Sequence, residues 1–154
     1  MMRTPIHQLE GVRMKNALIL TSVLAFSAIT GPALAAPADL KVEVHGIKQV
    51  KGEILVAVFD KKEKWLRDAI VRKSVDAKLG AVELVFTNLP EGEYAISVLH
   101  DANSNGVMDA NAIGIPTEAY GFSNDASGTF GPASFADAKF KLEGAGKSIS
   151  IRVN

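Results

Sequence analysis

Residues 100–109 read HDANSNGVMD, a run in which oxygen-bearing side chains recur at every second position before a glycine and a further carboxylate. Calcium takes roughly six to eight oxygen ligands, and a turn tightened by glycine can bring alternate side chains to one centre. We therefore expect a calcium site in this run. Its predicted ligands are the backbone carbonyl of Val107 and the side chains of Asp101, Asn103, Asn105, Asp109 and Glu118.

The expected shell departs from that of an EF-hand. The twelfth loop position, where an EF-hand carries a bidentate glutamate, is Ala112, and no flanking helices are predicted. Either Glu118 or Asp125 would have to complete the shell, and the spacing does not choose between them. Because two amides replace carboxylates, we expect a dissociation constant on the order of 10⁻⁴–10⁻³ M. The alternative is a polar turn in which Asp and Asn side chains bond their own backbone without a metal.

The segments that must position this loop alternate between apolar and polar residues, which is the period of half-buried β-strands. Residues 53–60 are instead apolar on both faces and predict a central strand, and the turn before them favours an antiparallel hairpin with residues 40–46. The other predicted strands are residues 82–86, 94–99, 139–142 and 148–153. We expect an all-β fold, an antiparallel β-sandwich of immunoglobulin or prealbumin type with about seven strands.

Three further expectations concern segments between the strands. Residues 61–73 are the one helix-tolerant stretch, so we expect one or two helical turns there, with Trp65 packed against the sandwich. His100 shares a strand face with apolar residues, which predicts a buried histidine bonded to a loop carbonyl. Residues 101–138 form one long loop, and a loop of that length needs anchors. The candidate anchors are apolar: Ile113, Ile115, Tyr120, Phe122, Phe130 and Phe135.

Residues 1–35 have the pattern of a secretory signal peptide, and Met14 is a plausible true start. Lys15 is followed by the apolar residues 17–29 and by small residues that end at Ala35, where we expect cleavage. The apolar run is shorter than the roughly 20 residues that span a bilayer, so no stable membrane span is expected. We predict a single domain over residues 36–154, located in the periplasm or secreted.

Charge and cysteine content narrow the class of protein. Residues 36–154 contain 14 Lys and Arg against 16 Asp and Glu, with no basic cluster, which disfavours nucleic-acid binding. The chain has no cysteine, so disulfides, thiolate metal sites and a cysteine nucleophile are excluded.

Three motifs in order resemble a family of bacterial exported proteins known only as the domain of unknown function DUF2141. They are HDANSNGVMD, GIPTEAYGFSN at residues 114–124 and GPASFADA at residues 131–138. The resemblance implies a secreted β domain and supplies no activity. The turn LPEGEY at residues 89–94 is similar to a turn of transthyretin-like and carboxypeptidase-regulatory-like sandwiches, which bears on fold alone.

Three functions are compatible with these features. The first is a non-enzymatic module whose calcium-ordered loop offers Tyr120, Phe122 and Phe130 to a protein or glycan partner. The second is a small hydrolase or glycan-active enzyme. The hydroxyl, imidazole and carboxylate groups available for it belong to Ser123, Ser134, His100 and Asp101, although no nucleophile motif frames either serine. The third is a structural or assembly subunit that pairs through sheet edges.

Overall fold

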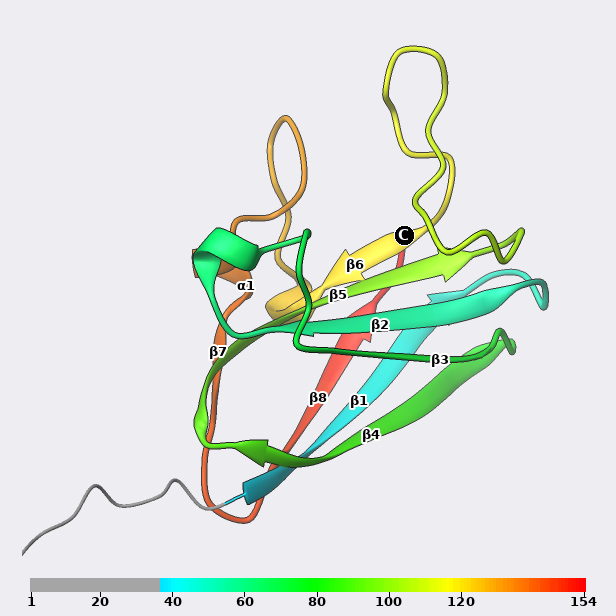
Figure 1. The fold of residues 1–154 in the computed structure, drawn as a ribbon. Helices are drawn as coiled ribbons and strands as arrows, with labels where there is room; N and C mark the ends of the chain where they lie inside the picture. Colours follow the sequence, from blue (N-terminus) through cyan, green and yellow to red (C-terminus); the bar gives the residue numbers. More distant parts are fainter. Residues whose placement is uncertain (1–36) are drawn as a thin grey trace, which may run out of the picture. The chain divides into compact units, whose positions relative to one another are not determined.

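The computed structural model describes residues 37–154, which form an all-β sandwich with one four-residue α-helix (Figure 1). The sandwich predicted from the sequence is therefore confirmed. The predicted signal peptide, residues 1–35, lies outside the described residues. The eight strands of the described part are β1 (Pro37–Ile47), β2 (Glu53–Phe59), β3 (Val71–Asp76), β4 (Gly80–Pro90), β5 (Gly92–Asp101), β6 (Tyr120–Phe122), β7 (Phe140–Leu142) and β8 (Lys147–Arg152).

The strands divide into two sheets. One has the order β4-β1-β8, in which β1 pairs antiparallel with β4 and parallel with β8. The other has the order β3-β2-β5-β6, all antiparallel, and β7 pairs with the beginning of β5. The short helices are η1 (Lys62–Lys64), η2 (Ser123–Asp125) and α1 (Phe135–Ala138).

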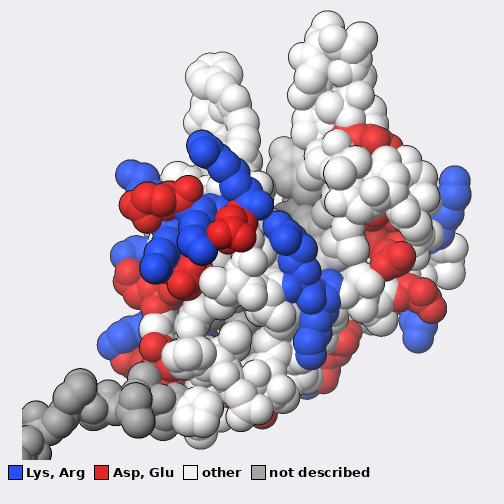
Figure 2. Space-filling view, in the orientation of Figure 1, with Lys and Arg blue, Asp and Glu red and all other residues white. Residues whose placement is uncertain are grey.

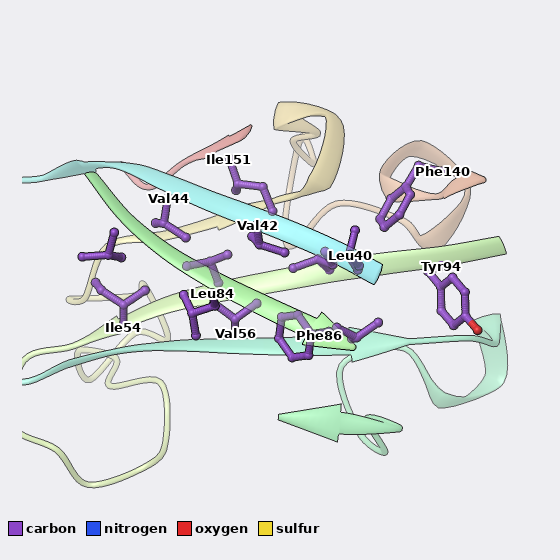
Figure 3. Packing of buried hydrophobic residues seen from close by; sticks show 14 of the residues in the cluster. Leu40, Val42, Val44, Ile54, Val56, Leu84, Phe86, Tyr94, Phe140 and Ile151 are labelled. Atoms are coloured by element: carbon purple, nitrogen blue, oxygen red, sulfur yellow. The ribbon is translucent and has the colours of Figure 1, made fainter. Parts of the chain in front are cut away.

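The main core lies between the two sheets, where apolar side chains from both inner faces meet (Figure 3). The period-two pattern of β1 places every second residue inside, and β2 and β5 supply the facing layer. The largest side chains that are essentially fully buried are Phe59, Phe86, Leu40, Ile54, Ile96, Leu142 and Ile151.

A smaller aromatic cluster covers the outer face of the β2-β5-β6 sheet. Trp65 packs edge-on against Phe59 and Phe135, with ring centroids 5.0 and 5.9 Å away, and is tilted against Phe122 at 5.7 Å. Its indole Nε1 donates a 2.8 Å hydrogen bond to the carbonyl of Ala133. The predicted packing of Trp65 is therefore confirmed.

Two local predictions were wrong. β1 and β2 do not form a hairpin, because the connection after Ile47 crosses from one sheet to the other and each strand pairs elsewhere. The alternation marked both strands correctly, but it does not specify a partner. The stretch 61–73 contains only the 3₁₀ turn η1 and then enters β3, an edge strand whose charged residues hid its β character.

The edge of β5 that faces away from β2 shows how the backbone N–H and C=O groups of this central strand find hydrogen-bond partners. β5 pairs with β7 at its start and with β6 near its end, and between them the N–H of Ile96 donates to the hydroxyl of Ser123 at 2.9 Å. That hydroxyl in turn donates to the carbonyl of Ala138. One fully buried serine thus fills the gap between two short strands.

The packing predicts unequal costs for truncating neighbouring residues of β4. Phe86→Ala should lower the free energy of unfolding by about 3–5 kcal/mol, because it empties a fully buried site. Val85→Ala, on the opposite face of the same strand and 38% exposed, should cost less than about 1 kcal/mol. Urea unfolding measures both values, and equal losses would contradict the inside-outside register of β4.

Candidate functional site

The segment that carries the predicted ligands is residues 102–119, here called the first loop, which leaves β5 and returns to β6. It projects beyond the sheets in Figure 1, coloured yellow-green. A single bridge between Ala110 and Pro116 pairs its two arms. Beyond that bridge, the side chain of Asn111 accepts hydrogen bonds from the N–H groups of Ile113 and Ile115 and so closes the tip.

Asp101 holds the start of the first loop. It is the last residue of β5 and only 1% exposed. Its Oδ1 accepts the N–H of Asn105 at 3.1 Å, and its Oδ2 accepts the N–H of Gly106 at 2.7 Å. A buried carboxylate with these two backbone donors bends the chain back over the strand end.

The two asparagines converge on one carboxylate. Asn103 donates its amide to Asp109 Oδ2 at 2.6 Å, and Asn105 donates to Asp109 Oδ1 at 3.1 Å. Their own Oδ1 atoms accept the N–H groups of Asn105 and Val107, respectively. Each asparagine therefore bonds the backbone two residues on, as Asx turns do, while its amide nitrogen partly balances the charge of Asp109.

Glu118 ties the returning arm to the outgoing one. Its Oε1 accepts the N–H of Ala102 at 2.8 Å, and its Oε2 accepts the N–H of Asp109 at 3.1 Å. Of the two residues proposed to complete the shell, Glu118 is the one that contacts this loop. Asp125 instead accepts the N–H of Arg152 beside β8.

The structure thus brings the five predicted side chains into one hydrogen-bonded cluster, which we call the acidic cluster: Asp101, Asn103, Asn105, Asp109 and Glu118. Val107 lies on its outer turn with an exposed side chain. Within residues 37–154, no group of three or more His, Cys, Asp or Glu side chains is arranged to hold a metal ion. Asn103 and Asn105 make the backbone bonds that the sequence also predicted for a polar turn.

The side chains considered as catalytic groups for hydrolysis all form hydrogen bonds with backbone groups of the fold. Ser123 is fully buried and bonded at both ends between β5 and α1. Ser134 caps α1, where its hydroxyl accepts the N–H of Asp137. His100 is 5% exposed and its Nε2 lies 2.9 Å from the carbonyl of Lys51, as predicted for a core histidine bonded to a loop carbonyl.

The apolar residues proposed as loop anchors divide into two groups. Phe122 and Phe135 are buried in the aromatic cluster, and half-buried Tyr120 packs edge-on against Phe122. Ile113, Ile115 and Phe130 are instead exposed. The expected aromatic patch of Tyr120, Phe122 and Phe130 is therefore not present, and the exposed apolar groups sit at loop tips.

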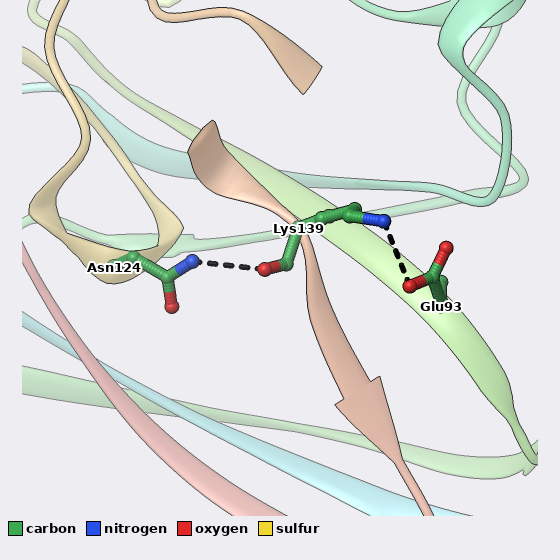
Figure 4. Close-up of polar contacts among 3 residues, drawn as sticks. All are labelled: Glu93, Asn124 and Lys139. Carbon is green, nitrogen blue, oxygen red and sulfur yellow. Dashed lines mark hydrogen bonds and ion pairs between the residues drawn. The ribbon is translucent and has the colours of Figure 1, made fainter. Parts of the chain in front are cut away.

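The second loop, residues 126–134, leaves η2 and is tied at its base. Asn124, with a positive φ of 62°, donates its amide to the carbonyls of Asp137 and Lys139 at 3.0 and 2.9 Å. Lys139 Nζ is paired with Glu93 at 2.9 Å, which joins this base to the start of β5 (Figure 4). Apart from the polar residues themselves, no pattern in the sequence predicts these contacts.

Two shallow hollows flank β6 beneath the loops. One, of about 290 Å³, is bordered by Tyr120, Asp125, Gly128 and Arg152; the other, of about 280 Å³, is bordered by Lys48, His100, Thr117 and Glu118. Both hollows are lined by a mixture of polar and apolar residues.

The fold and loops define this part of the chain as an all-β sandwich domain with two projecting loops. A family model described as "Uncharacterized protein conserved in bacteria (DUF2141)" matches residues 42–150, so the chain belongs to this family. No curated protein and no solved structure matches it. Among the described residues, no helix is long and apolar enough to cross a membrane.

The turn at Gly106 gives a direct test of the loop geometry. Gly106 has a φ of +79°, which strains any residue with a Cβ, whereas Gly131 in the second loop has an ordinary φ and open space around it. Gly106→Val should therefore raise amide hydrogen exchange at Asn105 and Val107 by about fivefold or more, since the left-handed conformation costs at least about 1 kcal/mol.

The matched variant Gly131→Val should leave those exchange rates unchanged. Unaltered protection in Gly106→Val would show that the turn does not need a positive φ.

Proposed function

We propose that this protein is an exported, non-enzymatic β-sandwich domain whose first loop is stabilised by a weakly bound calcium ion and serves as a binding surface. The observation that carries the proposal is the acidic cluster. Three carboxylates and two amides from both arms of the loop converge within one hydrogen-bonded network. Carboxylate and amide oxygens are the ligands that calcium prefers.

A bound ion would change the cluster in a defined way. Asp109 now receives the amide nitrogens of Asn103 and Asn105. Calcium would replace these donors, and both amides would turn so that oxygen faces the ion. The backbone bonds of Asp101 and Glu118 hold the loop near this geometry, which lowers the ordering cost of binding.

The binding role is supported by the outer part of the first loop. Beyond the cluster, the large apolar residues are exposed: Val107, Met108, Ile113 and Ile115. Apolar residues on a projecting loop do not contribute to the core, and exposed apolar groups of this kind mark interaction sites. The non-enzymatic role is supported by Ser123 and Ser134, whose hydroxyls are committed to backbone bonds.

The calcium site predicts a specific gain in thermal stability. At calcium concentrations about ten times Kd, the native state should gain about 1.4 kcal/mol. This gain corresponds to a rise in Tm of several degrees for a domain of this size. Differential scanning calorimetry in chelator, in millimolar magnesium and in millimolar calcium measures the shift.

Asp109→Asn should abolish the calcium shift, because it removes a charged ligand while keeping the size of the side chain. Asp76→Asn, at the end of β3, is the matched control and should retain the full shift. Identical melting curves in chelator and calcium for the parent chain would refute the calcium site.

Export predicts a defined processed chain. The small-residue site that ends at Ala35 should be cleaved, so that the protein recovered from the periplasmic fraction begins near Ala36. Cell fractionation and intact-mass measurement test this expectation. A chain that stays in the cytoplasm with residues 14–35 attached would contradict it.

A further inference from the structure

The two loops project from the same side of the sandwich (Figure 1). Phe130, in the second loop, is fully exposed, and Ile113 and Ile115, in the first, are 80% and 55% exposed. We propose that these two tips insert together into the interfacial region of a phospholipid bilayer. The inference deepens the binding role proposed above by naming the partner, and it does not depend on the calcium ion.

Hydrogen bonds hold the bases of both loops in place, whereas the side chains at the tips are exposed. The acidic cluster fixes the base of the first loop, and Ser123 and Asn124 fix the base of the second. Near the tip of the second loop, a Cβ on Gly128 would lie 2.3 Å from the carbonyl of Gly131, so the two arms approach closely and the bend is narrow. The tips are thus held apart from the body, and their apolar groups do not fold back onto it.

Charge is excluded from the tips. No Lys or Arg occurs between Lys78 and Lys139, and residues 126–136 contain no charged residue at all. In the first loop, Asp109 is the only charge between residues 102 and 117, and it lies in the acidic cluster. Figure 2 shows both projecting loops as white columns, whereas charged side chains crowd the body below.

This arrangement fits a bilayer better than a protein or glycan surface. The two tips are separate projections (Figure 2), and a fluid interface needs no matching shape. Glycan binding uses several aromatic faces together, but of the three aromatic residues predicted to form a patch only Phe130 is exposed, since Phe122 is buried and Tyr120 is half-buried. Amphipathic membrane binders likewise place Phe, Leu and Trp in the boundary between headgroups and acyl chains.

The absence of Lys and Arg from both loops also determines which lipid headgroups the tips should prefer. Binding should occur on zwitterionic phosphatidylcholine and should change little with salt, because no basic residue is available to attract anionic headgroups. The acidic residues at the loop bases should make anionic phosphatidylglycerol a poorer surface in chelator. Calcium bound in the acidic cluster would reduce that penalty.

The test uses the processed chain and places a fluorescent ring at one tip. Phe130→Trp is mixed with phosphatidylcholine vesicles that carry bromine on the acyl chains. The fluorescence added by this new indole, above that of Trp65, should fall by about half, since indole rings settle at the membrane interface. Leu79→Trp is the matched control: Leu79 is 64% exposed but lies in the β3–β4 turn, so its added fluorescence should be retained.

A second measurement gives the contribution of each tip. Phe130→Ser and Ile113→Ser should each weaken partitioning onto these vesicles about tenfold, which is equivalent to about 1.4 kcal/mol. Leu79→Ser should leave it unchanged. All three residues are exposed and lie outside the core, and circular dichroism checks that the variants fold.

Equal quenching at positions 79 and 130 would mean non-specific adsorption and would overturn the inference. Absent quenching would also overturn it, and a doubling of mass in light scattering would then assign the tips to a second copy of the chain. The result is separable from the calcium proposal. If the indole at position 130 is quenched but Tm does not rise with calcium, only the proposed calcium site is refuted. If Tm rises with calcium but the indole is not quenched, only the proposed membrane insertion is refuted.

Discussion

The structure depends on satisfying the backbone of β5, the strand that borders both loops. One side of β5 pairs with β2 from Ala95 to Asp101, but the other side has only two three-residue strands, β6 and β7. The hydroxyl of Ser123 bonds the N–H of Ile96 between them, and the carbonyl of Ala119 accepts the N–H of His100 beyond them. Because unpaired buried amides are costly, these two bonds allow the strand to remain central while the chain on that side is mostly loop. The projecting loops are a consequence of this arrangement, since the segments that complete β5 are short and the chain between them has nothing to pair with.

Much of the sandwich could be predicted because alternation reports which face of a strand is buried. It identified parts of β1, β4, β5, β7 and β8, and it placed His100 in the core, whereas β2 was identified as a run that is apolar on both faces. Alternation does not indicate which strands pair with one another. The parallel pairing of Leu40 with Lys147 joins distant parts of the chain, and nothing local in either segment encodes it. β3 and β6 were missed for different reasons: the first is a charged edge strand, and the second lies within residues 101–138, which were predicted to form one long loop. That prediction was wrong, because β6, η2 and α1 divide the segment into two loops.

The candidate site was predictable where short-range polar spacing decides the geometry. Asp101, Asn103, Asn105 and Asp109 lie together because each bonds within eight residues of itself, and Glu118 completes the cluster from the returning arm. Exposure of aromatic side chains was not predictable in this way. Phe122 and Phe130 lie eight residues apart among similar small residues, yet one fills the cluster around Trp65 and the other stands at a loop tip. The difference arises from the position of β6 in the sheet, which is a tertiary property.

The parallel pairing of β1 with β8 has a consequence for biosynthesis. β1 is the first described strand to leave the ribosome and β8 is the last, so one edge of β1 lacks its partner for nearly the whole of translation. The sheet β4-β1-β8 is complete only after Arg152 has been made, and closing it brings together residues more than a hundred positions apart, which is slow because of the loop entropy. The sheet β4-β1-β8 therefore cannot close during synthesis of the earlier strands. For an exported chain, as proposed above, this late pairing would place the completion of the sandwich after translocation.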